Sequence, residues 1–591
     1  MMSFRAVRIC LFVVLFGAVL LVFLPSAGND FVDWDDYAFV TRNHHIRTLD
    51  LRAISWMFTT FYQGAWHPLT WFSHGMDVAV GALNPSFHHL MNVLIHCVNV
   101  LLFFALCVSL QERLVVGRDR IYAAAFAAAL LFGVHPLRVE SIAWVAERKD
   151  VLCTLFYLAT LLAYLGYVKA ESSGSRRAYY LLAVVFCLGA ALSKPMSMTL
   201  PIVLLVLDFY PLQRLEPRSA VPRVWEKTPF LAIAAATAIL NFLAAKGAAI
   251  PFSYVTPSVR IMNAFHGMVF YIEKSLMPFG LVPLYQLDPN ADYFSPKFLL
   301  SAALVLIVTG LVIRRALRGD RLWAAAWFYY LITLGPALGL FMSFRHAAAD
   351  RYSYLSTLSF WLLVGLGFGR LWTAAAKSVR FAAVIRGTLV VWLVAAAFAY
   401  AHQTREQIAV WKNSVTLWTY VIDTSHYKPA LAFYGLGRAL EAQGELDRAL
   451  EGYQMAVSLN PAHSKYVGAV ANVMARKGRL EESLAIYREI QEKEPQNPRS
   501  HIDVGRVLSM KGQLDEAAAA FKKATEVDPE SGRAWAMLAV SYLDRNDKER
   551  AIECYKKYLS LGFPRSSNLE FRLGWRSKAE SAAPDIPPDS D

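Results

Sequence analysis

The sequence contains few charged residues for its length. Only 18% of its 591 residues are Asp, Glu, Lys or Arg, whereas 56% are hydrophobic, and the mean hydropathy is +0.34. These values exclude a chain that is soluble throughout, because a soluble protein of this length carries more charge. The apolar residues fill long blocks in roughly the first 400 positions, while roughly the last 160 resemble a soluble helical domain. We therefore expect two regions that face different solvents.

Cysteine is also scarce. Five of the six cysteines lie in apolar stretches and the sixth, Cys554, lies near the C-terminus. Their spacing indicates neither a metal site nor a disulfide framework. The net charge of +13 could suggest nucleic-acid binding, but Lys and Arg cluster between the hydrophobic blocks, as the positive-inside rule predicts for a membrane protein. We expect no nucleic-acid partner.

The hydrophobic blocks have the length of membrane-spanning helices, which need about 20 mostly apolar residues. We expect about eleven spans, at residues 9–27, 88–110, 121–134, 151–168, 179–193, 196–212, 228–245, 297–313, 322–342, 353–372 and 384–401. The apolar segment 262–284 contains Glu273 and Lys274, so we expect it to be interfacial or re-entrant. The first block follows Arg5 and Arg8 and resembles a signal peptide. We favour a first span, because many spans follow it.

The loops between the spans fall into two classes. One alternate set is short and basic, which places these loops and the N-terminus in the cytoplasm; its members are Arg113, Arg118, Arg120, Arg176, Arg177, Arg214, Arg218, Arg223, Lys227, Arg314, Arg315, Arg318, Arg321, Lys377, Arg380 and Arg386. An odd number of spans then places the C-terminal region outside the cytoplasm, with the chain in the inner membrane. The opposite loops, 28–87, 135–150, 193–195, 246–296 and 343–352, are rich in Asp, Glu, His, Trp and Arg. They indicate a site at the outer membrane surface.

The C-terminal region repeats every 34 residues. Small residues and aromatic residues recur at this spacing, with a proline near the end of each unit, and the residues expected to pack the helices together are Gly437, Gly444, Ala449, Tyr453, Gly478, Tyr487, Gly505, Gly512, Ala517, Phe521, Trp535 and Ala551. The pattern resembles tetratricopeptide repeats. We expect a membrane domain at 1–402, a linker or partial repeat at 403–429, four repeats at 430–564 and a disordered tail at 565–591. The array is either a stacked-helix spacer or a surface that binds a protein or peptide, and we favour binding.

The first external loop carries an acidic sequence, Asp33-Trp34-Asp35-Asp36. A carboxylate at a membrane surface can act as a general base toward a hydroxyl group, or it can hold a divalent metal. The alternative is a hydrated loop whose aspartates cap helices. Further ionisable residues lie in the segments 66–70, 87–96, 135–150 and 345–352. Ionisable groups at membrane depth are costly and therefore indicate function, and this mixture suits an anionic, lipid-linked substrate.

Taken together, these loops, the Lys194-Pro195 segment, the Asp350-Arg351-Tyr352 segment and the C-terminal repeats resemble the transmembrane and tetratricopeptide-repeat-containing family of O-mannosyltransferase-like proteins, as a bacterial-type member. The resemblance covers nearly the whole chain. It implies an all-α membrane bundle with a GT-C glycosyltransferase fold, followed by a tetratricopeptide α-solenoid. It also implies transfer of a sugar from a polyprenyl-phosphate carrier to an acceptor hydroxyl, such as protein Ser or Thr, on the extracytoplasmic side.

The resemblance assigns roles to particular residues. The catalytic group comprises Asp35, Asp36 and Glu140, with Asp36 or Asp35 as the base, and the donor-binding group comprises His135, Arg148, Asp150, Lys194 and Arg351. The Arg148-Lys149-Asp150 stretch departs from the usual Gly-Arg-Ala-Asp form of the family. A divalent metal held by Asp35, Asp36 and Glu140 stays open as a cofactor. Two rival functions are a non-catalytic membrane-anchored scaffold for envelope complexes and a transporter of lipid-linked sugars, and the gathering of charges at one face favours the enzyme over both.

Overall fold

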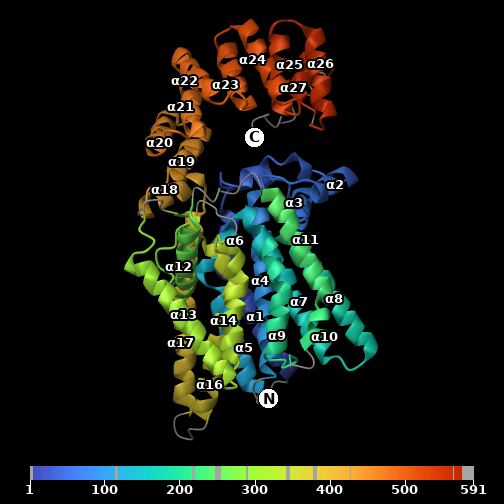
Figure 1. Ribbon diagram of the computed structural model, residues 1–591, viewed down its shortest axis with the longest axis vertical. Helices are drawn as coiled ribbons and strands as arrows, with labels where there is room; N and C mark the ends of the chain where they lie inside the picture. The colour runs from blue at the N-terminus through green and yellow to red at the C-terminus, as the bar shows by residue number, and fades with distance from the viewer. Residues whose placement is uncertain are drawn as a thin grey trace. The chain divides into compact units, whose positions relative to one another are not determined.

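A computed structural model describes residues 4–113, 118–215, 220–245, 255–287, 291–340, 346–376, 382–425, 427–563 and 565–575. The chain forms two compact units, residues 1–427 and 428–591 (Figure 1). Both are helical. The strands among the described residues are the short antiparallel pair β1 (Tyr285–Gln286) and β2 (His346–Ala348). The expected all-α membrane bundle followed by a helical repeat array is confirmed.

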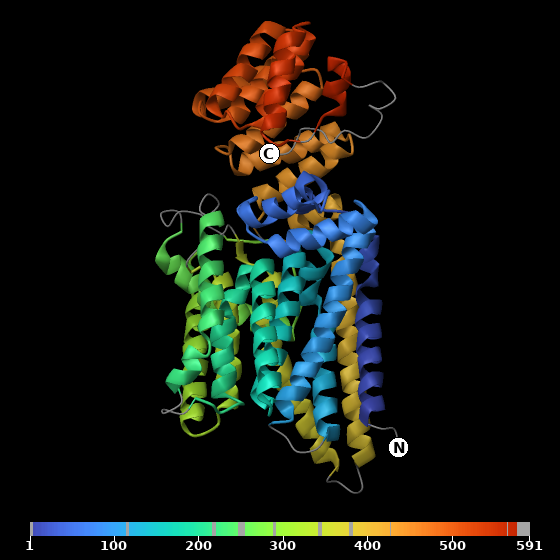
Figure 2. The same cartoon turned by 90° about the vertical axis from the view of Figure 1, so that its right-hand side faces the viewer.

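The first unit is a helical bundle. Its helices are α1 (Phe4–Phe23), α2 (Leu51–Thr59), α3 (Pro68–Gly81), α4 (Pro85–Gln111), α5 (Arg118–Gly133), α6 (Val139–Ala143), α7 (Arg148–Lys169), α8 (Ser173–Ser193), α9 (Leu200–Phe209), α10 (Ala220–Trp225), α11 (Thr228–Ala245), α12 (Pro257–Leu276), α13 (Pro296–Leu317), α14 (Leu322–Leu334), α15 (Ser353–Ser356), α16 (Leu358–Ala376), α17 (Ala382–Val410) and α18 (Ser414–Thr424). The long helices run side by side in both views (Figures 1 and 2).

Within the described residues, eight helices are long and apolar enough to cross a membrane, and a ninth span forms if the pair Arg120–Gly133 and Pro136–Ala143, bent by 58°, counts as one. The chain is therefore a multi-pass membrane protein. Eight or nine is fewer than the expected eleven, because two apolar blocks form shorter helices. The block 196–212 becomes the apolar helix Pro195–Phe209, which ends before Pro211. The block 322–342 gives the 13-residue α14, whose helix ends at a Gly-Pro pair.

The first and last long helices of this unit run parallel. The Arg405 guanidinium donates to the carbonyl of Leu21 at 3.0 Å, and the Asn29 amide donates to the carbonyl of Ile408 at 3.1 Å. The chain therefore leaves α17 at the end of the bundle opposite to the N-terminus. α1 also packs against α4 and α5, so it is an integral part of the bundle.

Where α7 and α9 end, buried charged side chains hold the helices of the bundle together. Lys227 contacts Asp208 at 2.8 Å, and Arg214 contacts Glu226 at 2.8 Å. The hydroxyl of Tyr164 lies among all four side chains. This network joins α7, α9 and the start of α11, and every charge in it has a partner of the opposite sign.

The second unit is a row of antiparallel helix pairs. Its helices are α19 (Ala430–Ala442), α20 (Leu446–Leu459), α21 (Ser464–Arg476), α22 (Leu480–Lys493), α23 (Pro498–Met510), α24 (Leu514–Val527), α25 (Gly532–Asp544), α26 (Lys548–Ser560) and α27 (Ser567–Leu573). The turns inside the pairs have φ between +59° and +82°, at Gly444, Gly478, Gly512 and Asn546. Glycine is favoured there because a left-handed backbone strains other residues.

The other repeat residues lie between the helices. A Cβ atom at Gly437 or Gly505 would come within 2.7 Å of the ring of Tyr453 or Phe521, so the glycine lets the ring of the facing helix approach. Buried side chains fill the same layers, namely Ala449, Tyr487, Ala517 and Ala551. Trp535 is half-buried and donates to the carbonyl of Pro529 at 2.9 Å.

Candidate functional site

Charged side chains gather at the end of the membrane unit where α7 begins and α8 ends. Glu147, just before α7, is 2% exposed and is the common partner of three cations. Its carboxylate lies 3.1 Å from the Lys149 amine, 3.4 Å from the Lys194 amine and 3.4 Å from Nε of Arg351. Glu147 thus draws together cations from three separate parts of the chain.

Two further carboxylates complete this charged cluster. Glu140 of α6 accepts from the backbone N–H of Arg351 at 2.8 Å and also pairs with its guanidinium. Asp150 pairs with the Lys194 amine, and it accepts from the hydroxyl of Ser141 at 3.2 Å. The structure therefore brings together four of the residues expected at the site: Glu140, Asp150, Lys194 and Arg351.

Asp36 ties the first loop to this cluster. Its carboxylate is fully buried and accepts from the N–H of Val32 at 3.0 Å and of Ala146 at 2.7 Å, one on each oxygen. Complete burial raises the pKa of Asp36 to about 7, against these two hydrogen bonds, which lower it. The side chain fixes the loop against the segment just before α7.

Asp35 is placed differently from its neighbour. Its side chain is half-buried, and it lies in the electrostatic field of Lys149, Glu147 and Arg351. Burial raises the pKa of Asp35 above its ordinary value, although the charge of Lys149 opposes the shift. A carboxylate with a raised pKa is a better proton acceptor near neutral pH. Of the acidic pair, Asp35 is the less buried member.

Four tryptophans support the loop beside these carboxylates. Trp34 lies 4.7 Å from Trp144 and 5.0 Å from Trp418, measured between ring centroids, and stacks on Trp411 at 6.4 Å. The Arg351 guanidinium lies 5.4 Å from the centre of the Trp144 ring. The aromatic group packs the first loop and α18 onto the segment before α7.

Two of the expected donor-binding residues lie outside the charged cluster. His135 is fully buried: Nδ1 accepts from the N–H of Leu137, and Nε2 contacts the carbonyl of Ser275, both at 3.2 Å. Arg148 is also fully buried and points to the other side of α7, where it pairs with Asp77. Neither side chain is exposed to a substrate in this structure.

Sequence reasoning missed three members of the site. Glu147 and Lys149 were within the recognised turn but were assigned no role. Asp350, which accepts from the Tyr285 hydroxyl at 2.9 Å, was also unassigned. For Glu147 and Lys149, the one indication in the sequence is that all four residues 147–150 are charged. That pattern does not show which of these side chains join the charged cluster. That choice depends on the direction of each residue at the start of α7.

Asp35, Asp36 and Glu140, for which a divalent metal was left open, are not grouped with ligand spacing in the described part of the chain. Both oxygens of Asp36 accept backbone N–H groups, and both oxygens of Glu140 contact Arg351. In the part of the chain that the structure describes, the one group of His, Cys, Asp and Glu with ligand spacing consists of His74, Asp77 and His88. No step of the chemistry proposed below runs through a metal at Asp35, Asp36 and Glu140.

Comparison with known proteins gives matches for both units. A family model described as tetratricopeptide repeat matches residues 420–464, 434–498 and 505–566. Protein O-mannosyl-transferase F38B6.6 of Caenorhabditis elegans is 24% identical over 474 residues, which are 76% of this chain and 63% of that protein. Protein O-mannosyl-transferase Tmtc3 of Drosophila melanogaster is 23% identical over 476 residues, 69% of this chain and 50% of that protein. The chain thus covers less than two thirds of the length of either relative.

Among solved structures, MamA from Desulfovibrio magneticus RS-1 is 19% identical and covers 27% of this chain and 86% of that chain, with a TM-score of 0.23. The sequence relatives are more informative, since they match the greater part of the chain. This chain is a multi-pass membrane homologue of the transmembrane and tetratricopeptide-repeat-containing protein O-mannosyl-transferases, and it carries tetratricopeptide repeats of its own.

Proposed function

We propose that this protein is a membrane glycosyltransferase of the GT-C type, which transfers a sugar from a polyprenyl-phosphate carrier to an acceptor hydroxyl, such as protein Ser or Thr. The observation that carries the proposal is the half-buried Asp35 in the electrostatic field of Lys149 and Arg351, the cations that Glu147 holds together with Lys194 at one end of the membrane unit. The names of the relatives support the same reaction class.

The chemistry is a single displacement. The acceptor hydroxyl gives its proton to the Asp35 carboxylate, and its oxygen forms a bond to the anomeric carbon. The bond from that carbon to the phosphate oxygen breaks, and polyprenyl phosphate leaves with the electron pair. Arg351, with Lys149 and Lys194, stabilises the charge on the leaving phosphate, as fixed cations do in a site with little water.

Asp36 acts as a positioning residue in this proposal. Each of its oxygens already accepts a backbone N–H group, and the residue is fully buried, whereas Asp35 is half-buried and can meet the acceptor hydroxyl. It holds the loop that carries Asp35 against Ala146, one residue before Glu147. This assignment makes Asp35, rather than Asp36, the base.

The orientation is part of the proposal: the cluster faces the extracytoplasmic side. α7 begins and α8 ends at the cluster, so the loop between them, which precedes Arg176 and Arg177, lies at the other end of the bundle. Lys169 at the end of α7 and Arg176 and Arg177 near the start of α8 make that end basic, which favours the cytoplasm for it. The long outward-facing loops then hold the chemistry.

We further propose that the repeats bind the acceptor or a partner protein. Polar residues occupy one equivalent position in three successive repeats, namely Arg438, Asn472 and Arg506. Arg506 donates to the Asn472 side chain at 2.9 Å, and Asn472 donates to Glu441 at 2.7 Å, so polar side chains form a continuous row along successive repeats. Such a row of donors and acceptors suits an extended peptide.

The test is a mass-spectrometric comparison of envelope glycoproteins and lipid-linked sugars in cells that produce the wild-type chain, the Asp35→Asn variant or no chain. Asp35→Asn should lower sugar attachment by about 100-fold to 10,000-fold, the usual effect of losing a general base. Asp30→Asn is the matched control, since Asp30 is exposed in the same loop. Wild-type levels of modified peptides with Asp35→Asn would overturn the assignment of the base, and identical glycoproteins with and without the chain would overturn the function.

A further inference from the structure

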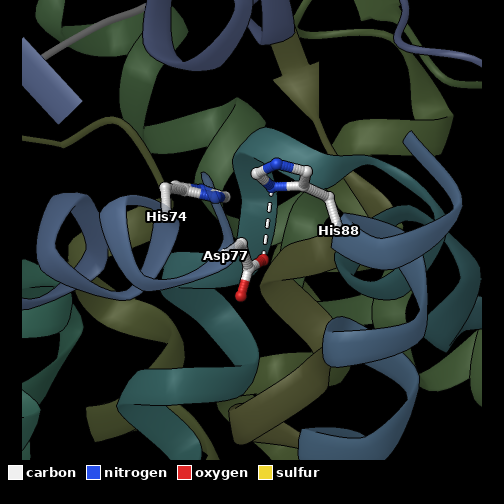
Figure 3. Close-up of side chains that lie close together, drawn as sticks. All are labelled: His74, Asp77 and His88. Atoms are coloured by element: carbon white, nitrogen blue, oxygen red, sulfur yellow. Dashed lines mark ion pairs between the residues drawn. The ribbon is translucent and has the colours of Figure 1, made fainter. Parts of the chain in front are cut away.

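A second cluster of ionisable side chains lies on the other side of the start of α7. His74 and Asp77 are three residues apart on α3, which places them on one face of the helix, and His88 reaches them from the first turns of α4. The three side chains converge on one point (Figure 3). Their ligand atoms lie within 4.8 Å of one another, and all three side chains are at most 3% exposed.

His74 has no hydrogen-bond partner in the part of the chain that the structure describes. Both of its ring nitrogens are buried and unpaired. Buried polar atoms are nearly always paired, because leaving one without a partner costs free energy. Neither the Asp77–Arg148 pair nor the contact between His88 Nδ1 and Asp77 at 3.2 Å accounts for this imidazole. The imidazole lies against a carboxylate and a second imidazole and points into the cluster, as a ligand does.

Arg148 occupies the position of an outer support. Its guanidinium pairs with Asp77, and it also donates to the Asn92 side chain and to the carbonyl of His88, each at 2.7 Å. A carboxylate has about four lone-pair sites, so Asp77 can accept from Arg148 and still bind an ion. Carboxylate ligands of metals are commonly held by hydrogen bonds in this way.

We propose that His74, Asp77 and His88 form a divalent transition-metal site, with zinc as the favoured ion. Two imidazoles and one carboxylate are the donor set that zinc takes with three protein ligands, and soft or purely oxygen-binding ions fit it less well. The site is separate from the charged cluster at Glu147. It links α3 and α4 directly, and it reaches α7 through Arg148, whose chain neighbours Glu147 and Lys149 belong to that cluster.

The test uses the full-length chain, purified in detergent with a tag that contains no histidine, stripped with a chelator and then given Zn²⁺. After free ion is removed, elemental analysis should find about one zinc per chain, falling to less than about one tenth in the His74→Gln, His88→Gln double variant, because the ligand lone pairs are gone. His402→Gln is the control, since this histidine is 68% exposed and far from the cluster in the sequence. It should bind as the wild type does.

Binding of Co²⁺ can be measured on the wild-type chain alone, so this test does not require that a variant folds. Co²⁺ in a four-coordinate nitrogen and oxygen site absorbs strongly in the visible range, and Zn²⁺ added afterwards should abolish that absorption in the wild-type chain. Two results would overturn the proposal: wild-type protein that retains no stoichiometric zinc and gives no such spectrum, or a folded double variant that binds zinc as the wild type does. Sugar transfer is not measured, so the outcome is independent of the proposed transferase activity.

Discussion

The two units use the same kinds of charged side chain in opposite surroundings. In the membrane unit, Arg148 and Asp77 are 0% and 3% exposed, whereas Arg479 and Glu482 in the repeats are 44% and 56% exposed. A buried ion pair costs much desolvation, and removing one partner leaves the other charge uncompensated. An exposed pair is screened by water and contributes little. Breaking a buried pair of the membrane unit should therefore cost more than breaking an exposed pair of the repeats, whose packing depends on small residues and aromatic rings.

The largest effect is expected from breaking the buried pair. Arg148→Met should lower the free energy of unfolding by about 3–5 kcal/mol, because Asp77 is left as a buried charge without a cation. The measurement is thermal unfolding of the full chain in detergent, after metal has been removed with a chelator so that no ion compensates Asp77. If Arg148→Met lowered the free energy of unfolding no more than a replacement of an exposed arginine does, burial would not set the strength of these ion pairs.

Removing the common partner of the cations should damage activity more than folding. Glu147→Gln keeps the shape of the side chain but loses the charge that holds Lys149, Lys194 and Arg351 together, and a displaced cation costs about 100-fold in rate. The measurement is sugar attachment to envelope proteins, with the amount of folded chain determined in parallel. Glu445→Gln in the repeats is the matched control, because its pair with Arg448 is exposed. Equal effects of the two changes would contradict the proposed site.

In the repeat unit the sensitive positions are small residues. Gly505→Ala should cost about 1–3 kcal/mol by overpacking, since the new Cβ would lie 2.7 Å from the Phe521 ring. Gly468→Ala is the control, because its Cβ would be 3.5 Å from Tyr487, an ordinary contact. Alanine there should be neutral or stabilising through helix propensity. Hydrogen exchange of the full chain, followed in α23 and α24 for Gly505→Ala and in α21 and α22 for Gly468→Ala, would distinguish them. Unchanged exchange around Gly505→Ala would show that this layer tolerates the extra volume.

The pH dependence of stability should report Asp36. A carboxyl group whose pKa is raised to about 7 in the folded protein binds its proton more tightly there than in the unfolded chain. Its contribution to stability is therefore largest at low pH and is lost as the pH rises from about 4 towards 7, by up to about 1.4 kcal/mol per pH unit. Comparing the melting temperatures of the wild type and Asp36→Asn between pH 5 and 7 tests this. A wild-type curve that rises relative to the variant across this range would refute the sign.

The smallest effect is expected from the exposed pair of the repeats. Arg479→Ala should change the free energy of unfolding by less than about 1 kcal/mol, because solvent screens its interaction with Glu482. Local hydrogen exchange in α22 measures the change. A loss as large as that of Arg148→Met would mean that the surroundings do not set the strength of these pairs.

The repeats could be predicted from the sequence more completely than the site. Gly444, Gly478 and Gly512 mark left-handed turns because that conformation is a local property of one residue. The membrane helices were equally readable as apolar blocks, except where proline shortened them, as before Pro211. Among the predicted site residues, Glu140 and Arg351 meet although they are 211 positions apart, and the resemblance alone brought them together beforehand.

Adjacent residues show where sequence reasoning fails. Glu147 and Arg148 are neighbours at the start of α7, yet Glu147 joins the charged cluster and Arg148 joins Asp77 on the other side. Successive side chains on a helix point about 100° apart, so a shift of one position along the chain changes which side chains a residue contacts. Asp35 and Asp36 are divided in the same way, since only Asp36 has both oxygens taken by backbone donors.

The sequence by itself determined which region lies in the membrane and which in water, and it determined the helical class and the 34-residue repeat. It also showed that ionisable residues are concentrated in one set of loops. These follow from composition and from periods that are local along the chain. Only the tertiary structure decided which residue of the acidic pair is less buried, that Glu147 is the common partner of the cations, and that His74, Asp77 and His88 converge. Those features depend on the packing of α3, α4, α7 and the first loop, and packing sets the burial and distance on which the strength of every charged contact depends.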